Sequence, residues 1–370
     1  MEKPKLFQKV EVDFILLATV LLILAIGVVM VYSASSYIAL NNPGIHDDMY
    51  YFKKQGVFAI LGILILFFME KVDYHNLKKA TTVIILATMV LLGVVLLFPA
   101  VNGAKRWITV GPLSLQPSEI AKYAVVLILA KGIEKNGEKI KKFFPTVFVY
   151  LLVAAFFAGF VYLEKNLSIA TVIMIVSIIV IYVGGAKGWQ LGAIILSLLP
   201  VGLIFILAEP YRLQRLKNFM NPWSDSNGTG YQAIQSLYAL GSGGIAGVGL
   251  GQSRQKCYYI PEPHNDFIFS IIGEELGFIG CVIIIILFII IIQRGIRIAI
   301  RAKDVYGTLL AVGITSVIAI QAMINIAVVT GAIPVTGVPL PFISSGGSSL
   351  VINLTAMGIL LNISSQTIKK

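Results

Sequence analysis

The chain consists largely of apolar stretches close to twenty residues long, which short polar segments separate. The first stretch covers residues 14–31, and the later ones cover residues 52–69, 81–98, 117–130, 145–163, 168–183, 190–208, 267–292, 307–330 and 345–363. A helix of about 20 apolar residues matches the hydrocarbon core of a bilayer. Because lipid offers the backbone no hydrogen bonds, the pattern predicts an all-α polytopic membrane protein with about ten transmembrane helices.

The composition agrees with this fold class. Of the 370 residues, 57% are hydrophobic and 13% are charged, whereas roughly a quarter are charged in a soluble domain. The net charge of +11 does not indicate binding of nucleic acid. The basic residues cluster between the apolar stretches, where such residues set the membrane topology or contact anionic lipid headgroups. The two cysteines and three histidines lack the spacing of a disulfide framework or a metal site.

The distribution of basic residues predicts the orientation in the membrane, because cytoplasmic loops carry an excess of Lys and Arg. With the N-terminus inside, 18 of the 29 basic residues fall in cytoplasmic segments: Lys3, Lys5, Lys9, Lys71, Lys78, Lys79, Lys131, Lys135, Lys139, Lys141, Lys142, Lys187, Arg294, Arg297, Arg301, Lys303, Lys369 and Lys370. We therefore expect both termini in the cytoplasm. Residues 1–370 then form a single integral membrane domain, with an extracellular loop at residues 209–266 between helices 7 and 8.

Two parts of this long loop have their own patterns. Residues 231–240 carry apolar side chains at helical spacing and are expected to form a helix on the membrane surface. The glycine-rich run at residues 241–251 is not a dinucleotide-binding fingerprint, because no strand precedes it and its third glycine is misplaced. We expect this run to be either flexible or a close-packed re-entrant segment.

Asp266 stands where the long polar loop ends and an apolar stretch begins. A carboxylate at the edge of a membrane is energetically unfavourable, so its presence there indicates a function. Burial raises the pKa of a carboxyl group, which suits a general base near neutral pH. We predict that Asp266 is the catalytic base of an outward-facing cavity. The alternative is that Asp266 caps the helix that follows, since aspartate is a good N-cap residue.

A second group of candidates lies between residues 105 and 122. Glu119 and Lys122 share one helix face, so they either line the cavity or form a buried ion pair that fixes helix packing. Lys105 and Arg106, at the predicted outer rim, either bind phosphates or are solvated loop charges. Trp107 is either an anchor at the membrane interface or a platform for the substrate.

The third group lies in residues 325–349, where prolines, glycines and serines predict irregular backbone. At membrane depth such backbone is tolerated where it is buried or lines a cavity. A tight turn with small residues for helix packing is the alternative. Ser345 and Ser348 are candidates for substrate contact. Of Glu274 and Glu275, one is expected to point inward, and Glu275 is the candidate.

Three motifs far apart in the chain point to one family. They are Gly-Ala-Lys-Arg-Trp-Ile followed by Gln-Pro-Ser-Glu, Pro-Glu-Pro-His-Asn-Asp-Phe-Ile-Phe with Glu-Glu-Leu-Gly, and Asn325 with the box Ser-Ser-Gly-Gly-Ser-Ser. Together they are highly specific, and over nearly its whole length the chain resembles the shape, elongation, division and sporulation (SEDS) family. The segments that start at residues 218 and 251 look closer to its FtsW and stage V sporulation protein E branch than to RodA. Asn265 departs from the family, which usually has threonine before its catalytic aspartate.

This resemblance implies a peptidoglycan glycosyltransferase that polymerises lipid II at the outer face of the cytoplasmic membrane. The partners that it implies are a class B penicillin-binding protein and other division or sporulation proteins, without nucleic acid. Asp266 matches the essential aspartate of the family, and Arg106, Trp107, Glu119 and Lys122 match positions tied to activity or to the central cavity.

The chemistry needs a base for the acceptor hydroxyl and cations for the pyrophosphate leaving group. Lys105, Arg106 and Lys122 are the candidate cations, and a divalent cation, Mg²⁺ or Mn²⁺, is the one cofactor considered. Two other functions fit parts of the pattern. A flippase for a lipid-linked oligosaccharide also has intramembrane charges, although the chain shows no inverted repeat. A non-catalytic scaffold of the division machinery would need only the surfaces that bind partners.

Overall fold

The computed structural model describes residues 12–101, 103–111, 113–207, 210–226, 228 and 230–367. Each of the predicted apolar stretches coincides with a helix: α1 (Phe14–Asn41), α2 (Tyr50–Lys71), α3 (Tyr74–Val95), α4 (Pro117–Asn136), α5 (Phe148–Leu163), α6 (Leu167–Val183), α7 (Gly188–Leu207), α10 (Ile268–Arg301), α11 (Val305–Val329) and α12 (Gly347–Ser365). In the described part of the chain, six helices (α1, α2, α3, α10, α11 and α12) are long and apolar enough to cross a membrane. The protein is therefore mostly helical, with several helices suited to a bilayer. Some predictions fall outside the described residues: those for Lys3, Lys5, Lys9, Lys369 and Lys370, and that for Glu209 at the start of the long loop.

Polar side chains set where several of these helices begin. Asp13 accepts a hydrogen bond from the backbone N–H of Leu16 at 3.0 Å, and Asp304 accepts one from Gly307 at 2.7 Å. Such caps satisfy donors that the first helical turn leaves free. At its other end, α1 continues ten residues beyond the predicted stretch, because Ser35 bonds back to the carbonyl of Val31 at 2.6 Å and stays helical.

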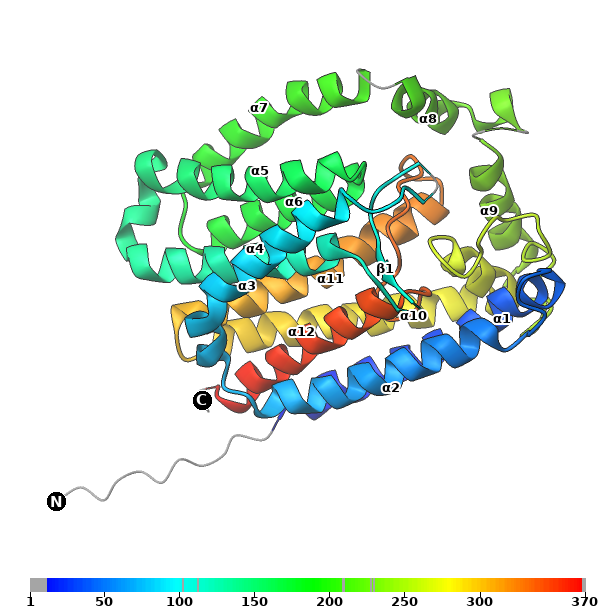
Figure 1. The fold of residues 1–370 in the computed structure, drawn as a ribbon, viewed down its shortest axis with the longest axis horizontal. Helices are drawn as coiled ribbons and strands as arrows, with labels where there is room; N and C mark the ends of the chain where they lie inside the picture. The colour runs from blue at the N-terminus through cyan, green and yellow to red at the C-terminus, as the bar shows by residue number, and fades with distance from the viewer. Residues whose placement is uncertain are drawn as a thin grey trace.

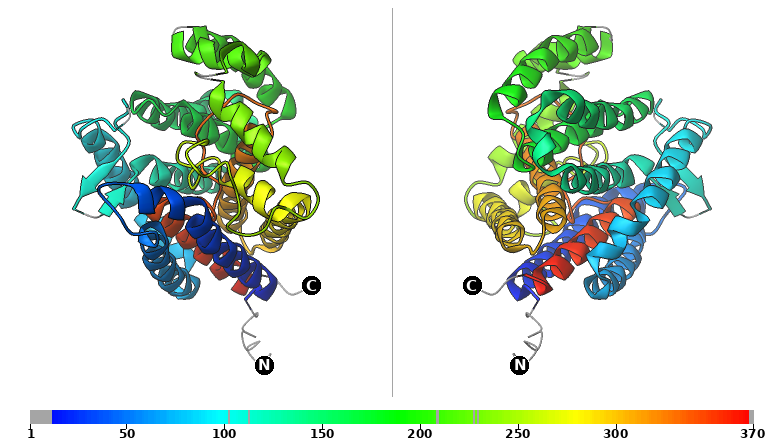
Figure 2. Two further views of the ribbon diagram at one scale, coloured as in Figure 1. Left: turned by 90° about the vertical axis from the view of Figure 1, so that its right-hand side faces the viewer. Right: turned by 90° about the vertical axis from the view of Figure 1, so that its left-hand side faces the viewer.

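The helices pack as a bundle in which α12 lies along α2, α10 lies along α11, and α11 also contacts α4 and α6 (Figure 1). The α7 helix packs mainly against α6 and α8 and forms an outer rim of the molecule (Figure 2). The start of α1 and the end of α12 meet, since the N–H of Asp13 donates to Ser364 Oγ at 3.1 Å. Asp13 also pairs with Arg294 of α10 at 2.6 Å. This ion pair and hydrogen bond mark one end of the bundle.

The opposite end carries the long loop and its two helices, α8 (Pro210–Met220) and α9 (Tyr231–Ser242) (Figure 1). The α9 helix confirms the prediction that residues 231–240 are helical. It contacts α10 and α11, and Ser236 Oγ donates to the carbonyl of Val329 at 2.8 Å, so one face is buried in protein. The α8 helix was not predicted, nor was the antiparallel hairpin of β1 (Ile108–Val110) and β2 (Leu113–Leu115). The strands of the hairpin have only three residues each, and α8 is short and polar, so neither element stands out in hydropathy.

The glycine-rich run docks on a break in α10. At Gly277 the backbone has φ 66° and ψ −165°, so the helical hydrogen-bond ladder is interrupted. Four backbone bonds replace it: Val248 N to Glu274 O (3.0 Å), Gly249 N to Glu275 O (3.1 Å), Phe278 N to Gly244 O (2.9 Å) and Ile279 N to Ile245 O (3.1 Å). A Cβ at Gly247 would lie 2.1 Å from the carbonyl oxygen of Glu275, which explains the need for glycine. We expected the glycine-rich run to be either flexible or closely packed, and the structure shows that it is closely packed against α10.

Candidate functional site

Asp266 lies in the last loop residues before α10, at the end of the bundle that carries the long loop. The N-cap of α10 is Phe267, and no side chain caps this helix, so the alternative that Asp266 is the cap is wrong. Its carboxyl group is half-buried, and burial raises its pKa to about 6. A hydrogen bond from its own backbone N–H opposes this shift, the charge of Glu262 adds to it, and the charge of Arg215 opposes it. A base with this pKa is mostly deprotonated at neutral pH and still able to accept a proton.

Glu119 and Lys122 form a buried ion pair on the first turns of α4, with 2.9 Å between Nζ and Oε2. Ser349 of α12 donates a hydrogen bond to the same carboxylate oxygen at 2.8 Å. Next to the pair, Tyr123 donates to Asn353 Oδ1 at 2.7 Å. The pair therefore ties α4 to α12, as the packing alternative expects. A role of either side chain toward substrate stays a prediction.

Lys105, Arg106 and Trp107 lie in the connection between α3 and the hairpin. Arg106 donates to the backbone carbonyls of Glu164 (3.4 Å from Nε) and Lys165, and so holds the turn between α5 and α6. Lys105 is exposed, and its Nζ donates to the carbonyl of Leu96 at 2.9 Å. Trp107 is half-buried. Binding of phosphate by these residues stays a prediction.

Glu164 is a buried acidic residue that the sequence did not single out. Burial raises the pKa of its carboxyl group to about 8, although the Ser118 hydroxyl and the Arg106 guanidinium oppose the shift. The group is therefore mostly neutral at pH 7. In the sequence Glu164 ends an apolar stretch beside Lys165, which made it look like an ordinary loop charge.

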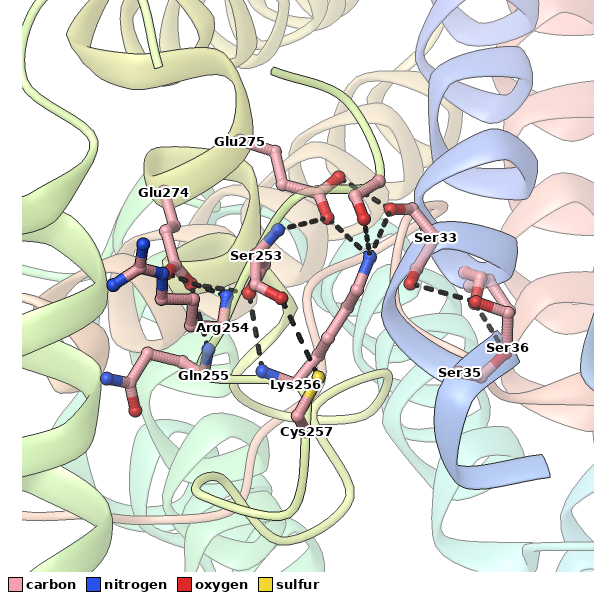
Figure 3. Close-up of polar contacts among 12 residues, drawn as sticks. Ser33, Ser35, Ser36, Ser253, Arg254, Gln255, Lys256, Cys257, Glu274 and Glu275 are labelled. Atoms are coloured by element: carbon pink, nitrogen blue, oxygen red, sulfur yellow. Dashed lines mark hydrogen bonds and ion pairs between the residues drawn. The ribbon is translucent and has the colours of Figure 1, made fainter. Parts of the chain in front are cut away.

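Glu274 and Glu275 are both buried and both hold the long loop to α10 (Figure 3). Glu274 accepts hydrogen bonds from the Ser253 hydroxyl and from the backbone N–H of Arg254, the latter at 3.0 Å. Glu275 pairs with Lys256 at 2.9 Å. Its second oxygen accepts a hydrogen bond from Ser33 of α1 at 2.5 Å.

We predicted that one of these glutamates points inward, but in the structure the side chains of both are buried and bonded to the long loop. Lys256 lies in the segment that starts at residue 251, but the sequence did not predict its pairing with Glu275, because the two residues are 19 positions apart. A contact of Glu275 with substrate stays a prediction. In the structure both of its carboxylate oxygens are occupied by protein groups.

The serine-rich segment joins the loop of Asp266 to the helix that carries Glu119. Ser345 donates its backbone N–H to the carbonyl of His264 at 2.8 Å. Ser348 Oγ accepts a hydrogen bond from the N–H of Gln116, just before α4, at 3.3 Å. The segment thus contains irregular backbone beside Asp266 and small residues that start α12. Substrate contacts of both serines stay predictions.

The described residues do not form a ready-made site for a divalent cation. In that part of the chain, no three His, Cys, Asp or Glu side chains converge as metal ligands do. Glu119 and Glu275 are each paired with a lysine instead. A protein-only metal site therefore does not fit these residues.

Comparisons with known proteins bear on the whole chain. Stage V sporulation protein E of Bacillus subtilis (strain 168) is 46% identical over 365 residues, which cover 96% of this chain and 98% of that protein. The probable peptidoglycan glycosyltransferase FtsW of Geobacter sp. (strain M18) is 39% identical over 358 residues, which cover 96% of this chain and 97% of that protein.

Solved structures show the same fold. The rod shape determining protein RodA of Thermus thermophilus gives a TM-score of 0.69 at 25% identity, over 97% of this chain and 98% of that chain. A chain from a structure on the coordination of polymerization and crosslinking by a peptidoglycan synthase complex gives 0.77 at 29% identity, over 95% and 97%. The cell cycle protein family of FtsW, RodA and SpoVE matches residues 13–369, and the chain therefore belongs to this family.

Proposed function

We propose that the protein is a peptidoglycan glycosyltransferase that polymerises lipid II in cell division or sporulation. Relatives over the full length are named for this activity or for sporulation. The observation that carries the proposal is the state of Asp266. Its half-buried carboxyl group has a raised pKa, and among the described residues no side chain donates a hydrogen bond to it. A carboxylate in this state is suited to take a proton from a substrate.

In the proposed reaction, Asp266 removes the proton of the acceptor sugar hydroxyl. The hydroxyl oxygen attacks the anomeric carbon of the donor, and the bond from that carbon to the pyrophosphate oxygen breaks. Undecaprenyl pyrophosphate leaves, and the anomeric centre inverts, so no second carboxylate is needed as a nucleophile. Lys105, Arg106 and Lys122 are the residues proposed to bear the negative charge of the leaving group.

The proposed arrangement in the membrane has ten spanning helices, α1 to α7 and α10 to α12. Both termini are then cytoplasmic, and the loop that carries α8 and α9 faces outside with Asp266 behind it. Two observations support this polarity. The start of α1 and the end of α12 share one end of the bundle, while the long loop occupies the other. The basic residues are concentrated at the end that carries the termini.

A class B penicillin-binding protein is the proposed partner. One structural relative belongs to a peptidoglycan synthase complex in which polymerization and crosslinking are coordinated. Crosslinking is a different reaction from glycan polymerisation, so a second active site has to supply it. Other proteins of division or sporulation are proposed to recruit the pair.

The test is polymerisation of labelled lipid II by the purified protein with its penicillin-binding partner, whose transpeptidase is blocked. We expect a glycan ladder with the wild type and none with Asp266→Ala or Asp266→Asn. The matched control is Asp47→Asn. Asp47 lies in the loop between α1 and α2, and its carboxylate is 38% exposed and paired with Lys53 of α2. This variant should polymerise as the wild type does. Normal turnover by Asp266→Asn would refute the assignment, and lipid movement without polymer in vesicles would favour a transporter.

A further inference from the structure

The loop that carries Asp266 is held at three consecutive backbone carbonyl oxygens. The carbonyl of His264 accepts the N–H of Ser345 at 2.8 Å, and that of Asn265 accepts the hydroxyl of Ser344 at 2.7 Å. The carbonyl of Asp266 accepts the side-chain amide of Asn325 at 2.7 Å. These donors come from α11 and from the segment before α12, far along the chain from the loop. The three bonds define the position of the loop relative to both.

Asn325 uses its amide nitrogen twice. Nδ2 donates to the carbonyl of Asp266 and, at 2.8 Å, to the carbonyl of Val338. An amide nitrogen has two hydrogens, so both donors are engaged. The side chain is 1% exposed, and loss of these donors would leave two buried carbonyls without a partner there. One amide therefore connects α11, the Asp266 loop and the segment of Val338.

The carboxylate of Asp266 depends on this backbone support. Among the described residues no side chain donates a hydrogen bond to the carboxylate, whereas the backbone N–H of Asp266 does, so the direction of the carboxylate depends on the backbone that carries it. The segment of Val338, which the Asn325 amide also holds, passes beside the carboxylate of Asp266. A Cβ at Gly337 in this segment would lie 3.6 Å from Asp266 Oδ2. A shift of either segment would change the space in which an acceptor sugar must lie.

We propose that Asn325 is a positioning residue for Asp266, and that its amide holds the base at the distance and direction needed for proton transfer. The inference rests on the proposed function. Ser344 supports the same loop one residue earlier, where its hydroxyl donates to Asn265 and accepts the N–H of Leu340 at 2.8 Å. Displacement of a catalytic group by about 1 Å is enough to lower a rate on the order of 100-fold.

The test compares Asn325→Leu with Gln321→Leu. Gln321 lies one turn earlier on α11, is also 1% exposed, and in the described part of the chain neither its oxygen nor its nitrogen has a hydrogen-bond partner. Both changes replace a buried amide with a side chain of similar volume, but only the first removes the two bonds to the loops. Two quantities are measured: lipid II polymerisation as kcat and KM, and hydrogen–deuterium exchange of the backbone over residues 258–269 by mass spectrometry.

For Asn325→Leu we expect kcat to fall on the order of 10- to 100-fold with KM changed less than about threefold, and exchange in residues 264–267 to rise. Gln321→Leu should leave both quantities unchanged. Ser344→Ala should move both in the same direction by a smaller factor, which serves as the second variant if Asn325→Leu does not fold. Unchanged kcat, or unchanged exchange, in folded Asn325→Leu would overturn the proposal. If the wild type does not polymerise lipid II, the proposed function fails, whereas the exchange experiment still decides whether the amide holds the loop.

Discussion

Four acidic side chains near the long-loop end of the bundle differ mainly in what surrounds them. Glu119 has the ammonium of Lys122 at 2.9 Å, and Glu275 has that of Lys256 at the same distance. Glu274 accepts hydrogen bonds from Ser253 and from a backbone N–H. In each of these three, protein groups donate to at least one carboxylate oxygen. Among the described residues no side chain donates to Asp266, and burial raises its pKa to about 6, so this carboxyl group is the one suited to accept a proton near neutral pH.

The raised pKa of Asp266 predicts the pH dependence of the reaction. The base acts when deprotonated, so kcat/KM should rise as pH increases through about 6 and then level off. A set of polymerisation rates between about pH 5 and pH 8 checks this. A midpoint near the ordinary pKa of about 4 would contradict it.

The same shift predicts a stability effect with a definite sign. Because the folded-state pKa exceeds that of the unfolded chain, Asp266 favours folding when protonated, and this contribution is lost as pH rises through about 6. Asp266→Asn should therefore melt at a higher temperature than the wild type at about pH 8 but not at about pH 4, although it is inactive.

The elements divide into those that form from local sequence and those that need distant partners. The apolar stretches were sufficient to locate the long helices, whereas their caps, such as Asp13 and Asp304, were seen only in the structure. Asp266 could be found because a carboxylate beside an apolar stretch is costly wherever it lies. The break at Gly277 could not be found, because it depends on hydrogen bonds to the glycine-rich run. The contact of Asn325 with Asp266 was equally hidden, since 59 residues separate them.

The close approach of the glycine-rich run to α10 predicts different results at two glycines. Gly247→Ala should destabilise the protein by on the order of 2 kcal/mol or more, because its Cβ would lie 2.1 Å from Glu275 O at φ +82°. Gly241→Ala, near the end of α9, has no atom within 4 Å of the new Cβ and should be neutral or slightly stabilising. Thermal unfolding in detergent compares the two, and equal melting temperatures would show that the run is not packed as described.

At the scale of the whole molecule, the bundle has two chemically different ends. The end that contains the start of α1 and the end of α12 is tied by the ion pair of Asp13 and Arg294. The other end contains the long loop, Asp266 and the buried pair of Lys256 and Glu275. Basic loops at the first end and the candidate site of Asp266 at the second agree with the proposed enzyme, which would receive its lipid-linked substrate on the outer side of the membrane.

Labelling of single cysteines tests this polarity. In a background of Cys257→Ser and Cys281→Ser, we expect a membrane-impermeant maleimide to label Ser226→Cys in intact cells. Glu138→Cys, in the connection between α4 and α5, should be labelled only after the cells are opened. Both positions are exposed, so accessibility of the side chain is matched. The reverse pattern would place Asp266 on the cytoplasmic side and contradict the proposed orientation.

The break in α10 also bears on the order in which the chain is assembled. The peptide groups freed at Gly277 are paired with residues 244–249, which leave the ribosome before α10 does. These partners are therefore already synthesised when α10 emerges, and in a bilayer each unpaired peptide group would cost on the order of several kcal/mol. The order of synthesis thus makes the glycine-rich run available to pair with the break as soon as α10 has been made.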